Sequence, residues 1–201
     1  MKPAKSEARL WRRVPGKIEV VVGPMFSGKS EWMISKLQLH KFAKNSILAI
    51  YHKEDLRYGK DAIHSHNGSK FLAEAATTTE DIEKLVAKLP NLEILGIDEI
   101  QFFDSRLAGL CLTLQKNGVS IYASGLDLDA SGVPWETTSA MMAIADRVEK
   151  KVAVCSKCNK INATRTQRIL KGKNSAKNLP RKVIGGVGTY EARCIKHYIR
   201  V

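Results

Sequence analysis

The chain has 201 residues, of which 44% are hydrophobic and 26% are charged, a composition typical of a globular protein with an apolar core. It contains no apolar run of about 18 residues, and its basic N-terminus lacks the apolar stretch of a secretory signal. We therefore expect no membrane span and a reducing, cytoplasmic location. The whole net charge of +13 falls in residues 147–201, which favours a polyanionic partner, either nucleotide or nucleic acid, unless it is simply a solvated basic surface.

Strands and helices are expected to alternate through the first three quarters of the chain. The β-branched run at residues 17–22 predicts a buried strand, and apolar residues at helical spacing in residues 30–44 predict a helix. Further strands and helices are predicted, in alternation, at residues 46–51, 79–88, 93–98, 104–116, 119–124 and 137–146. This order indicates an α/β fold, a mostly parallel sheet with helices on both faces. The isolated His40 and His52 are interpreted as surface residues of a helix and a strand.

The pattern changes near residues 147–151. Paired cysteines, a basic stretch and a glycine-rich segment follow there. We therefore predict a basic arm at residues 1–16, an α/β domain at residues 17–148 and a small second domain of short strands at residues 149–201.

The segment after the first predicted strand matches the phosphate-binding pattern GxxxxGK(S/T). In such loops backbone N–H groups surround phosphate oxygens at a helix N-terminus, the lysine reaches the β- and γ-phosphates, and the Ser/Thr hydroxyl can hold Mg²⁺. The alternative is a glycine-rich turn that merely ends a strand. The predicted phosphate-binding residues are Gly23, Pro24, Met25, Phe26, Ser27, Gly28, Lys29 and Ser30.

Two adjacent carboxylates, Asp98 and Glu99, end another apolar strand. Asp98 is suited to hold Mg²⁺, directly or through water, and Glu99 is then free to accept a proton. That proton would come from water in an ATPase or from a substrate hydroxyl in a kinase. Otherwise the pair is a solvated strand end.

The last quarter pairs its soft ligands at CxxC and CxxH spacing, as Cys155 with Cys158 and Cys194 with His197. Three thiolates and one imidazole are typical of a closed structural Zn²⁺ site, and a redox-active CxxC is the competing interpretation. The 35 residues between the two pairs would form a long basic loop tied at its base. Cys111 stands alone on an apolar helix face and is predicted to be a core residue.

Together these motifs resemble the zinc-containing thymidine kinases, a family that includes the cytosolic animal enzyme and most bacterial ones. The resemblance covers about residues 17–198 and includes further segments in family order. These are Asp55-Leu-Arg-Tyr58, Ser65-His-Asn-Gly68, Asp98-Glu-Ile-Gln-Phe-Phe103, Gly125-Leu-Asp127, Val183-Ile-Gly-Gly186 and Tyr190. It implies a P-loop NTPase-like domain followed by a small zinc-ribbon-like domain with a lasso loop.

The resemblance implies transfer of the γ-phosphoryl group of ATP to the 5′-hydroxyl group of thymidine or deoxyuridine, a salvage step for DNA synthesis, with Glu99 as the general base. It implies ATP with Mg²⁺ and thymidine as partners and a homotetramer or homodimer, without nucleic acid or membrane. Besides the P-loop, the positions matching ATP contacts are Arg57, Asp98, Glu99, Ile100 and Gln101. The positions matching the nucleoside pocket are Met25, Phe102, Leu126, Thr166, Arg181, Lys182, Val183, Ile184, Gly185 and Tyr190.

One position departs from the family pattern. The family carries an aromatic residue where this chain has Ala130. Either Phe102, Phe103 or Trp135 fills the gap, or the pocket is roomier and accepts more nucleosides.

Two alternatives use the same motifs differently. A P-loop ATPase could act on nucleic acid through the basic C-terminal part, although few aromatic side chains interleave with the basic residues there. A zinc-ribbon module could instead bind ATP without turning it over. Stimulation of ATP turnover by thymidine or by DNA discriminates among these hypotheses.

Overall fold

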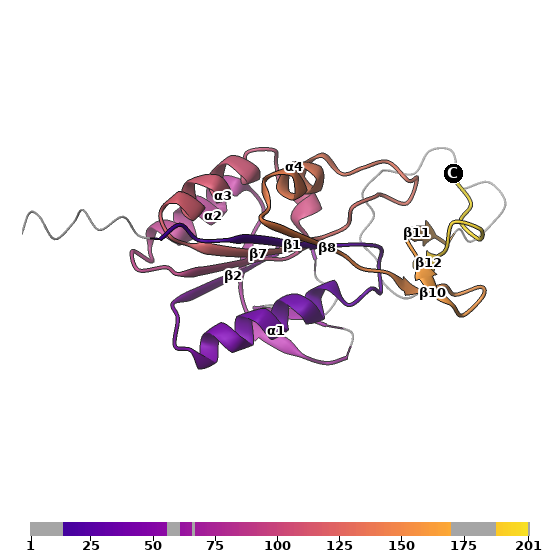
Figure 1. The fold of residues 1–201 in the computed structure, drawn as a ribbon, viewed down its shortest axis with the longest axis horizontal. Coiled ribbons are helices and arrows are strands. Elements are labelled where there is room, and N and C mark those ends of the chain that lie inside the picture. The colour runs from indigo at the N-terminus through magenta and orange to yellow at the C-terminus, as the bar shows by residue number, and fades with distance from the viewer. Residues whose placement is uncertain (1–13, 56–60, 66, 170–187, 201) are drawn as a thin grey trace, which may run out of the picture.

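A computed structural model describes residues 14–55, 61–65, 67–169 and 188–200. Its central element is a six-stranded sheet in the order β5-β2-β6-β7-β1-β8, in which every neighbouring pair is parallel (Figure 1). The strands are β1 (Ile18–Val22), β2 (Ile47–His52), β5 (Glu74–Ala76), β6 (Ile94–Ile97), β7 (Ser120–Gly125) and β8 (Arg147–Lys150). Because all six run the same way, the loops at their carboxyl ends share one edge of the sheet.

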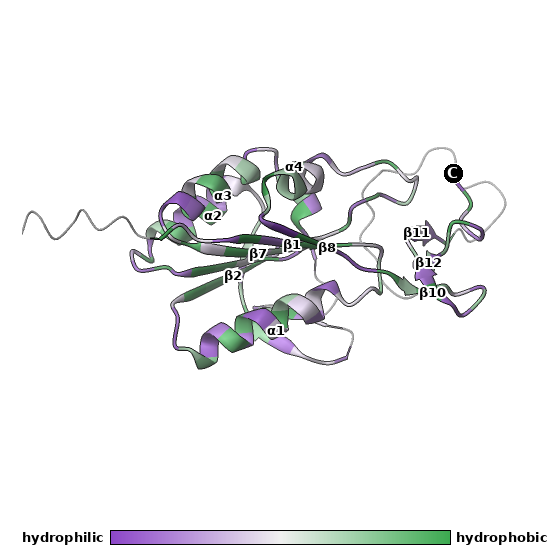
Figure 2. Cartoon of the chain, in the orientation of Figure 1, coloured by the Kyte–Doolittle hydropathy of each residue, from purple (hydrophilic) through white to green (hydrophobic). Residues whose placement is uncertain are grey.

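Helices cover both faces of this sheet. In Figure 1, α1 (Lys29–Phe42) lies below it, and α2 (Thr79–Ala87), α3 (Leu107–Lys116) and α4 (Glu136–Ile144) lie above it. Each face therefore has its own apolar layer: Met33 and Leu37 of α1 are fully buried on one side, and Leu107 of α3 and Met141 of α4 on the other. Figure 2 shows the hydrophobic residues gathered along the central strands. Burial of these apolar runs from water stabilises the layers.

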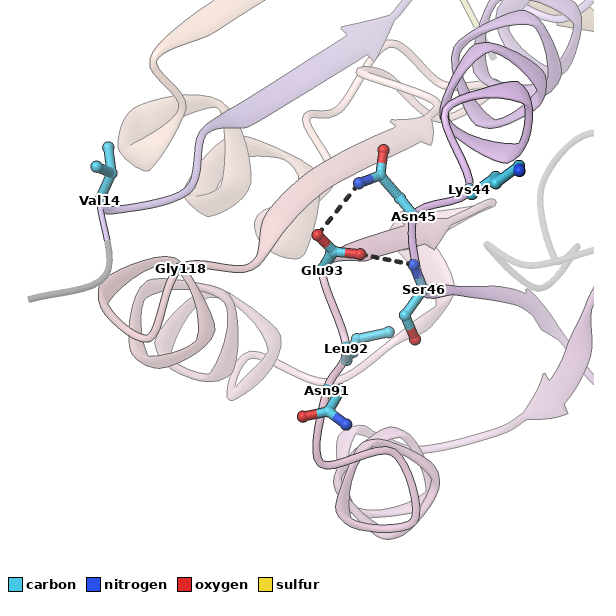
Figure 3. A pocket seen from close by; sticks show the side chains of 8 residues that line it. All are labelled: Val14, Lys44, Asn45, Ser46, Asn91, Leu92, Glu93 and Gly118. Carbon is cyan, nitrogen blue, oxygen red and sulfur yellow. Dashed lines mark hydrogen bonds between the residues drawn. The ribbon is translucent and has the colours of Figure 1, made fainter. Parts of the chain in front are cut away.

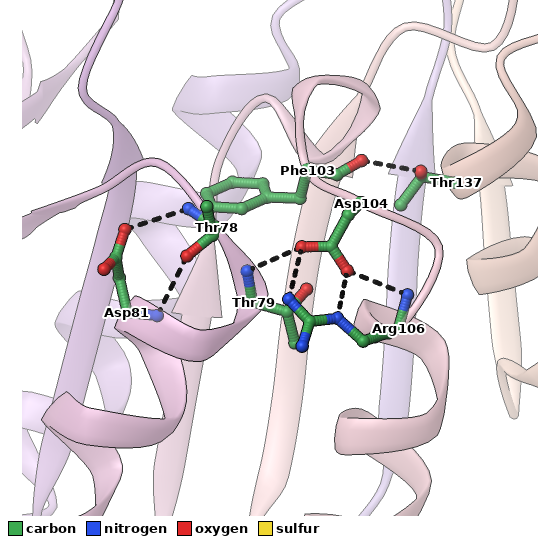
Figure 4. A network of polar contacts seen from close by, with 7 residues as sticks. All are labelled: Thr78, Thr79, Asp81, Phe103, Asp104, Arg106 and Thr137. Atoms are coloured by element: carbon green, nitrogen blue, oxygen red, sulfur yellow. Dashed lines mark hydrogen bonds and ion pairs between the residues drawn. The ribbon is translucent and has the colours of Figure 1, made fainter.

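A polar network joins the start of α2 to the segment before α3 (Figure 4). The Asp104 carboxylate accepts hydrogen bonds from the Thr79 N–H group (3.0 Å) and from Arg106 Nε (3.0 Å). Burial alone would raise the pKa of Asp104, but the Arg106 side chain and the backbone N–H donors outweigh it and hold the pKa below its usual range. Asp104 also accepts from the Arg106 N–H group, which explains why α3 begins at Leu107 and not at Asp104 as predicted.

The remaining strands form three two-stranded sheets. The hairpin of β3 (Ala62–His64) and β4 (Lys70–Leu72) packs beside α1. At the carboxyl end of the central sheet, β9 (Ala153–Val154) pairs with β10 (Ile161–Ala163), and β11 (Arg165–Arg168) pairs with β12 (Tyr190–Arg193) (Figure 1). We call residues 151–169 and 188–200 the C-terminal module.

The predicted α/β fold is confirmed, and the eight strands and helices predicted within it lie within three residues of their observed bounds. The domain boundary predicted after residue 148 falls inside β8, because Arg147–Lys150 pairs with β1 as the last strand of the central sheet. The interpretation of His52 as a surface residue is wrong: it is 1% exposed, with its ring against Phe102 and Phe103. Within the described ranges, no helix has both the length and the apolar composition needed to cross a bilayer.

A pocket of about 600 Å³ opens at the amino ends of the strands, opposite the edge that carries the predicted site (Figure 3). There Glu93 accepts hydrogen bonds from Asn45 Nδ2 (3.2 Å) and from the Ser46 N–H group (2.9 Å). Its lining is mostly polar and consists of Val14, Lys44, Asn45, Ser46, Asn91, Leu92, Glu93 and Gly118. The polar groups of Asn45 and Glu93 are thus engaged with each other across the pocket.

Candidate active site and metal cluster

The P-loop motif lies where the sequence predicts it, between β1 and α1. α1 begins at Lys29, so the unpaired N–H groups of its first turn face the loop. The loop is drawn together around one carbonyl: Lys29 Nζ donates to Pro24 O at 2.7 Å and Ser27 Oγ donates to the same oxygen at 2.8 Å. Lys29 is only 9% exposed, and its ammonium group is held inside the loop by the Pro24 carbonyl.

Asp98 connects β6 to β7 and to the start of α1 at this edge. It follows β6, and its carboxylate accepts hydrogen bonds from Ser30 Oγ (3.1 Å), from Ser124 Oγ at the end of β7 and from the Glu99 N–H group (3.0 Å). Burial, together with the nearby charge of Glu99, raises the pKa of Asp98 to about 6. A divalent cation would favour the charged form, and the Ser30 hydroxyl beside the carboxylate supplies the oxygen ligands that Mg²⁺ prefers. Ser124 is not recognisable from the sequence, where its only signal is a polar residue near the end of a buried strand.

Glu99 has a left-handed backbone, with φ 55° and ψ 44°, and precedes the short 3₁₀ helix η2 (Ile100–Phe102). Such a conformation is uncommon for a residue with a side chain. Gln101, two residues on, donates from Nε2 to the Glu99 carboxylate and accepts from the Leu126 N–H group (2.9 Å) at Oε1. The predicted base is therefore held by a side chain that is anchored in the loop after β7.

The residues predicted to line the nucleoside pocket are brought together only in part. Thr166 Oγ1 accepts the Met25 N–H group at 3.0 Å, which joins β11 directly to the P-loop. Phe102 meets the edge of Trp135, with 6.0 Å between ring centroids. Tyr190 is buried on β12, opposite Arg168. Residues 181–185 and Arg57, named from the sequence, lie outside the described residues.

The segment around Ala130 has an unexpected neighbour. Tyr198 Oη donates a 2.8 Å hydrogen bond to Ala130 O, and the same hydroxyl lies 3.2 Å from where a Cβ would sit on Gly132. Phe103, one of the three rings suggested to fill the gap, is buried in the core that underlies α3. An aromatic side chain from the end of the C-terminal module therefore covers this turn, a contact that the spacing of the sequence does not suggest.

Cys155, Cys158, Cys194 and His197 form a compact cluster, with all four candidate ligand atoms within 4.8 Å of one another. His197 Nδ1 lies 3.3 Å from Cys194 Sγ and 3.7 Å from Cys155 Sγ. A tetrahedral ion with bonds of about 2.0–2.3 Å separates its ligand atoms by roughly 3.5 Å, so the cluster has the size of a zinc site. The site fits a metal whose ligands are thiolates.

The state of the Cys155 thiol supports that fit. Burial alone would raise its pKa, but the backbone N–H groups of Cys194, Lys157 and Cys158, with the His197 ring, outweigh it and lower the pKa to about 5. The thiolate form that binds metal is therefore favoured before any ion arrives.

The P-loop contacts the apolar residues that surround the metal cluster. Phe26, in the P-loop, packs against the apolar cluster that contains Cys155 and Cys194. Together with the bond between Met25 and Thr166, this contact places the C-terminal module directly against the phosphate-binding loop.

Comparisons with known proteins agree with this arrangement. Residues 16–198 match the family model described as thymidine kinase. A thymidine kinase from Pyrobaculum aerophilum is 40% identical to this chain over 181 residues, which cover 90% of this chain and 97% of that protein.

Proposed function

The chain belongs to the thymidine kinase family, and we propose that it phosphorylates thymidine, with ATP as the donor, at the carboxyl edge of its central sheet. The observation that carries this proposal is the 3.1 Å hydrogen bond between Ser30 and Asp98. It joins the phosphate-binding loop to the strand end that bears Glu99, so a phosphoryl donor and a candidate base meet at one place.

Glu99 is the proposed general base. Its carboxylate accepts the proton of the 5′-hydroxyl group while the hydroxyl oxygen forms a bond to the γ-phosphorus. The bond between that phosphorus and the bridging oxygen of ADP breaks, and the products are thymidine monophosphate and ADP. The proton then passes from Glu99 to solvent.

The P-loop would hold the phosphates of ATP. Lys29 would exchange its bond to the Pro24 carbonyl for one to a phosphate oxygen, which its buried position supports. Ser30 and Asp98 would hold Mg²⁺, which when bound neutralises the charge of the phosphates. ATP contacts through Arg57, Ile100 and Gln101 stay predictions from the sequence.

The nucleoside would lie between the P-loop and the C-terminal module. The contact of Met25 with Thr166 supports this position, because it brings a predicted pocket residue of the P-loop together with one of the C-terminal module. Phe102 is the last residue of η2, which follows Glu99, and Leu126 donates its N–H group to Gln101 of the same short helix. The predicted contacts at residues 181–185 would close the pocket. Tyr198, which binds the turn at Ala130, would compensate for the missing aromatic residue.

The metal, the oligomer and the cell compartment complete the proposal. Zinc is the metal that the Cys₃His set fits best, and it would hold together the module that contacts the P-loop. A homotetramer or homodimer is supported by exposed apolar side chains on α1, since Phe42 is 84% and Leu39 is 64% exposed. The cytoplasmic location stays a prediction from the sequence.

Phosphoryl transfer from labelled ATP tests the proposal. Thymidine, deoxyuridine, deoxycytidine and deoxyguanosine are offered in parallel, with a well without nucleoside and a well with DNA. We expect monophosphate from thymidine and deoxyuridine only. Product from a wider set would indicate a loosened pocket at Ala130, and phosphate release driven by DNA without nucleoside product would favour the ATPase alternative.

Substitution of Glu99 tests the base. Glu99→Gln keeps the shape of the side chain but removes its proton acceptor. We expect ATP and thymidine to bind normally while kcat falls by about 10²- to 10⁴-fold. A near-normal kcat would remove Glu99 as the base.

A further inference from the structure

We propose that Gln101 is a positioning residue that fixes the Glu99 carboxylate for proton transfer, and that its side chain does not bind ATP. The inference rests on the proposed role of Glu99 as the base. It assigns to Gln101 a function different from the nucleotide contact that the sequence suggests.

Both ends of the Gln101 amide are already in use. Oε1 accepts the Leu126 N–H group at 2.9 Å, and Nε2 donates to the Glu99 carboxylate. A backbone N–H group can only donate and an ionised carboxylate can only accept, so the amide has one orientation that satisfies both partners. Leu126 therefore sets the direction in which Gln101 presents its donor to Glu99.

The surroundings leave this amide little freedom to move. Gln101 is 4% exposed, and a Cβ added at Gly125 would lie 2.7 Å from its Oε1 and 2.6 Å from Ile100 Cγ1. The absence of a side chain at Gly125 is thus what allows η2 to pack against the end of β7. A side chain held this closely is unsuited to swing towards a nucleotide.

The backbone conformation of Glu99 is one reason why its carboxylate benefits from the hydrogen bond of Gln101. Its left-handed backbone places it at a sharp turn between β6 and η2, where the main chain alone does not determine how the carboxylate is oriented. A hydrogen bond from a buried amide fixes the plane of that carboxylate. Because a misplacement of about 1 Å can reduce a reaction rate about 100-fold, loss of this bond should act on the chemical step.

The first test is Gln101→Met, which keeps the length of the side chain and removes both hydrogen bonds. We expect kcat to fall about 10- to 100-fold, with the KM values for ATP and thymidine changed by less than about threefold. Gln115→Met is the matched control: Gln115 lies on α3, where its amide donates to Asp146 at 2.8 Å, and kcat should stay unchanged. A raised KM for ATP with an unchanged kcat would show that Gln101 binds ATP and would overturn the proposal.

A double-mutant cycle separates this inference from the proposed function. In the Glu99→Gln background, Gln101→Met should change the residual kcat by less than about twofold, because the carboxylate that it orients is gone. Full additivity of the two losses would mean that Gln101 acts elsewhere and would overturn the proposal. If Glu99→Gln retains normal turnover, the base assignment fails; if Glu99→Gln is inactive and Gln101→Met is normal, the positioning role alone fails.

A second variant guards against misfolding of Gln101→Met. Gly125→Ala keeps the Gln101 side chain itself but crowds Ile100 Cγ1 and Gln101 Oε1, so η2 must shift and the hydrogen bond from Leu126 to Gln101 is strained. We expect the same loss of kcat with the same small change in KM. A normal kcat in a folded Gly125→Ala enzyme would overturn the proposal, since the amide would then be free to move without consequence.

Discussion

Thr166→Val removes the hydrogen bond that connects the C-terminal module to the P-loop. The Thr166 hydroxyl accepts the Met25 N–H group at 3.0 Å, and the two residues are 3% and 7% exposed. Valine has nearly the same shape as threonine, so the packing survives and the buried N–H group loses its acceptor. Leaving such a group unpaired costs about 1–3 kcal/mol.

Where this free energy appears depends on how the P-loop responds. If the loop keeps its conformation, the free energy of unfolding falls by about 1–3 kcal/mol. If the loop shifts so that the Met25 N–H group reaches water, the protein stays stable, and ATP must restore the loop when it binds. Since about 1.4 kcal/mol corresponds to a tenfold change in affinity, the Kd for ATP would then rise by about 5- to 150-fold. The loss in the free energy of unfolding and the loss in the free energy of ATP binding should together amount to about 1–3 kcal/mol.

Urea denaturation and calorimetric titration with ATP measure the two effects in the same preparation. Thr164→Val is the control: among the described residues, Thr164 Oγ1 accepts a hydrogen bond from the neighbouring Arg165 side chain alone, and we expect a change within about 0.5 kcal/mol. Unchanged stability and unchanged ATP affinity in Thr166→Val would refute the argument that this bond supports the P-loop. A rise confined to the KM for thymidine would instead indicate that the Thr166 hydroxyl contacts the nucleoside.

Three further outcomes are expected. Cys158→Ser should lower the zinc content from about one ion per chain, measured by metal analysis of the purified protein, and an unchanged content would reject the site. Asp104→Asn should destabilise the protein by about 1 kcal/mol at pH 7. Because the folded-state pKa of Asp104 lies below its ordinary value of 3.8, the greater stability of the wild type should be present above about pH 4 and be lost as the pH falls towards the folded-state pKa. Urea denaturation at several pH values measures this difference. Tyr198→Phe should raise the KM for thymidine by about 2- to 10-fold and leave the KM for ATP unchanged, and an unaltered thymidine KM would mean that the Ala130 turn does not support the nucleoside.

The sequence predicts the elements whose pattern is local. The strand before the P-loop is a run of β-branched residues, and the GxxxxGK(S/T) spacing carries its own geometry, so both are found without knowledge of the tertiary fold. β8 is different, because Arg147–Lys150 is polar and mostly exposed and forms a strand only by pairing with β1. Its place at the edge of the sheet follows from the fold and not from its composition.

The site shows the same division. Lys29, Asp98 and the cysteine pairs are recognisable because their spacing along the chain encodes their chemistry. The partners that orient them come from far away: Ser124 lies 26 residues after Asp98, and Leu126 lies 25 residues after Gln101. Such contacts depend on which strands become neighbours in the sheet, so a single sequence does not reveal them.

The burial of Cys111 means that its reaction with a thiol reagent reports on unfolding and not on loss of metal. Cys111 is 0% exposed, and burial raises the pKa of its thiol to about 12. The Cys111 thiol should therefore not react with alkylating reagents as long as the chain is folded. The other three cysteines all belong to the candidate metal cluster. Among them Cys155 and Cys194 are also buried and Cys158 is partly exposed. Labelling of the native protein should therefore report on loss of metal at Cys158, and a label on Cys111 should appear only on unfolding. A single mass spectrum would then distinguish molecules that have lost the metal from molecules that have lost the fold.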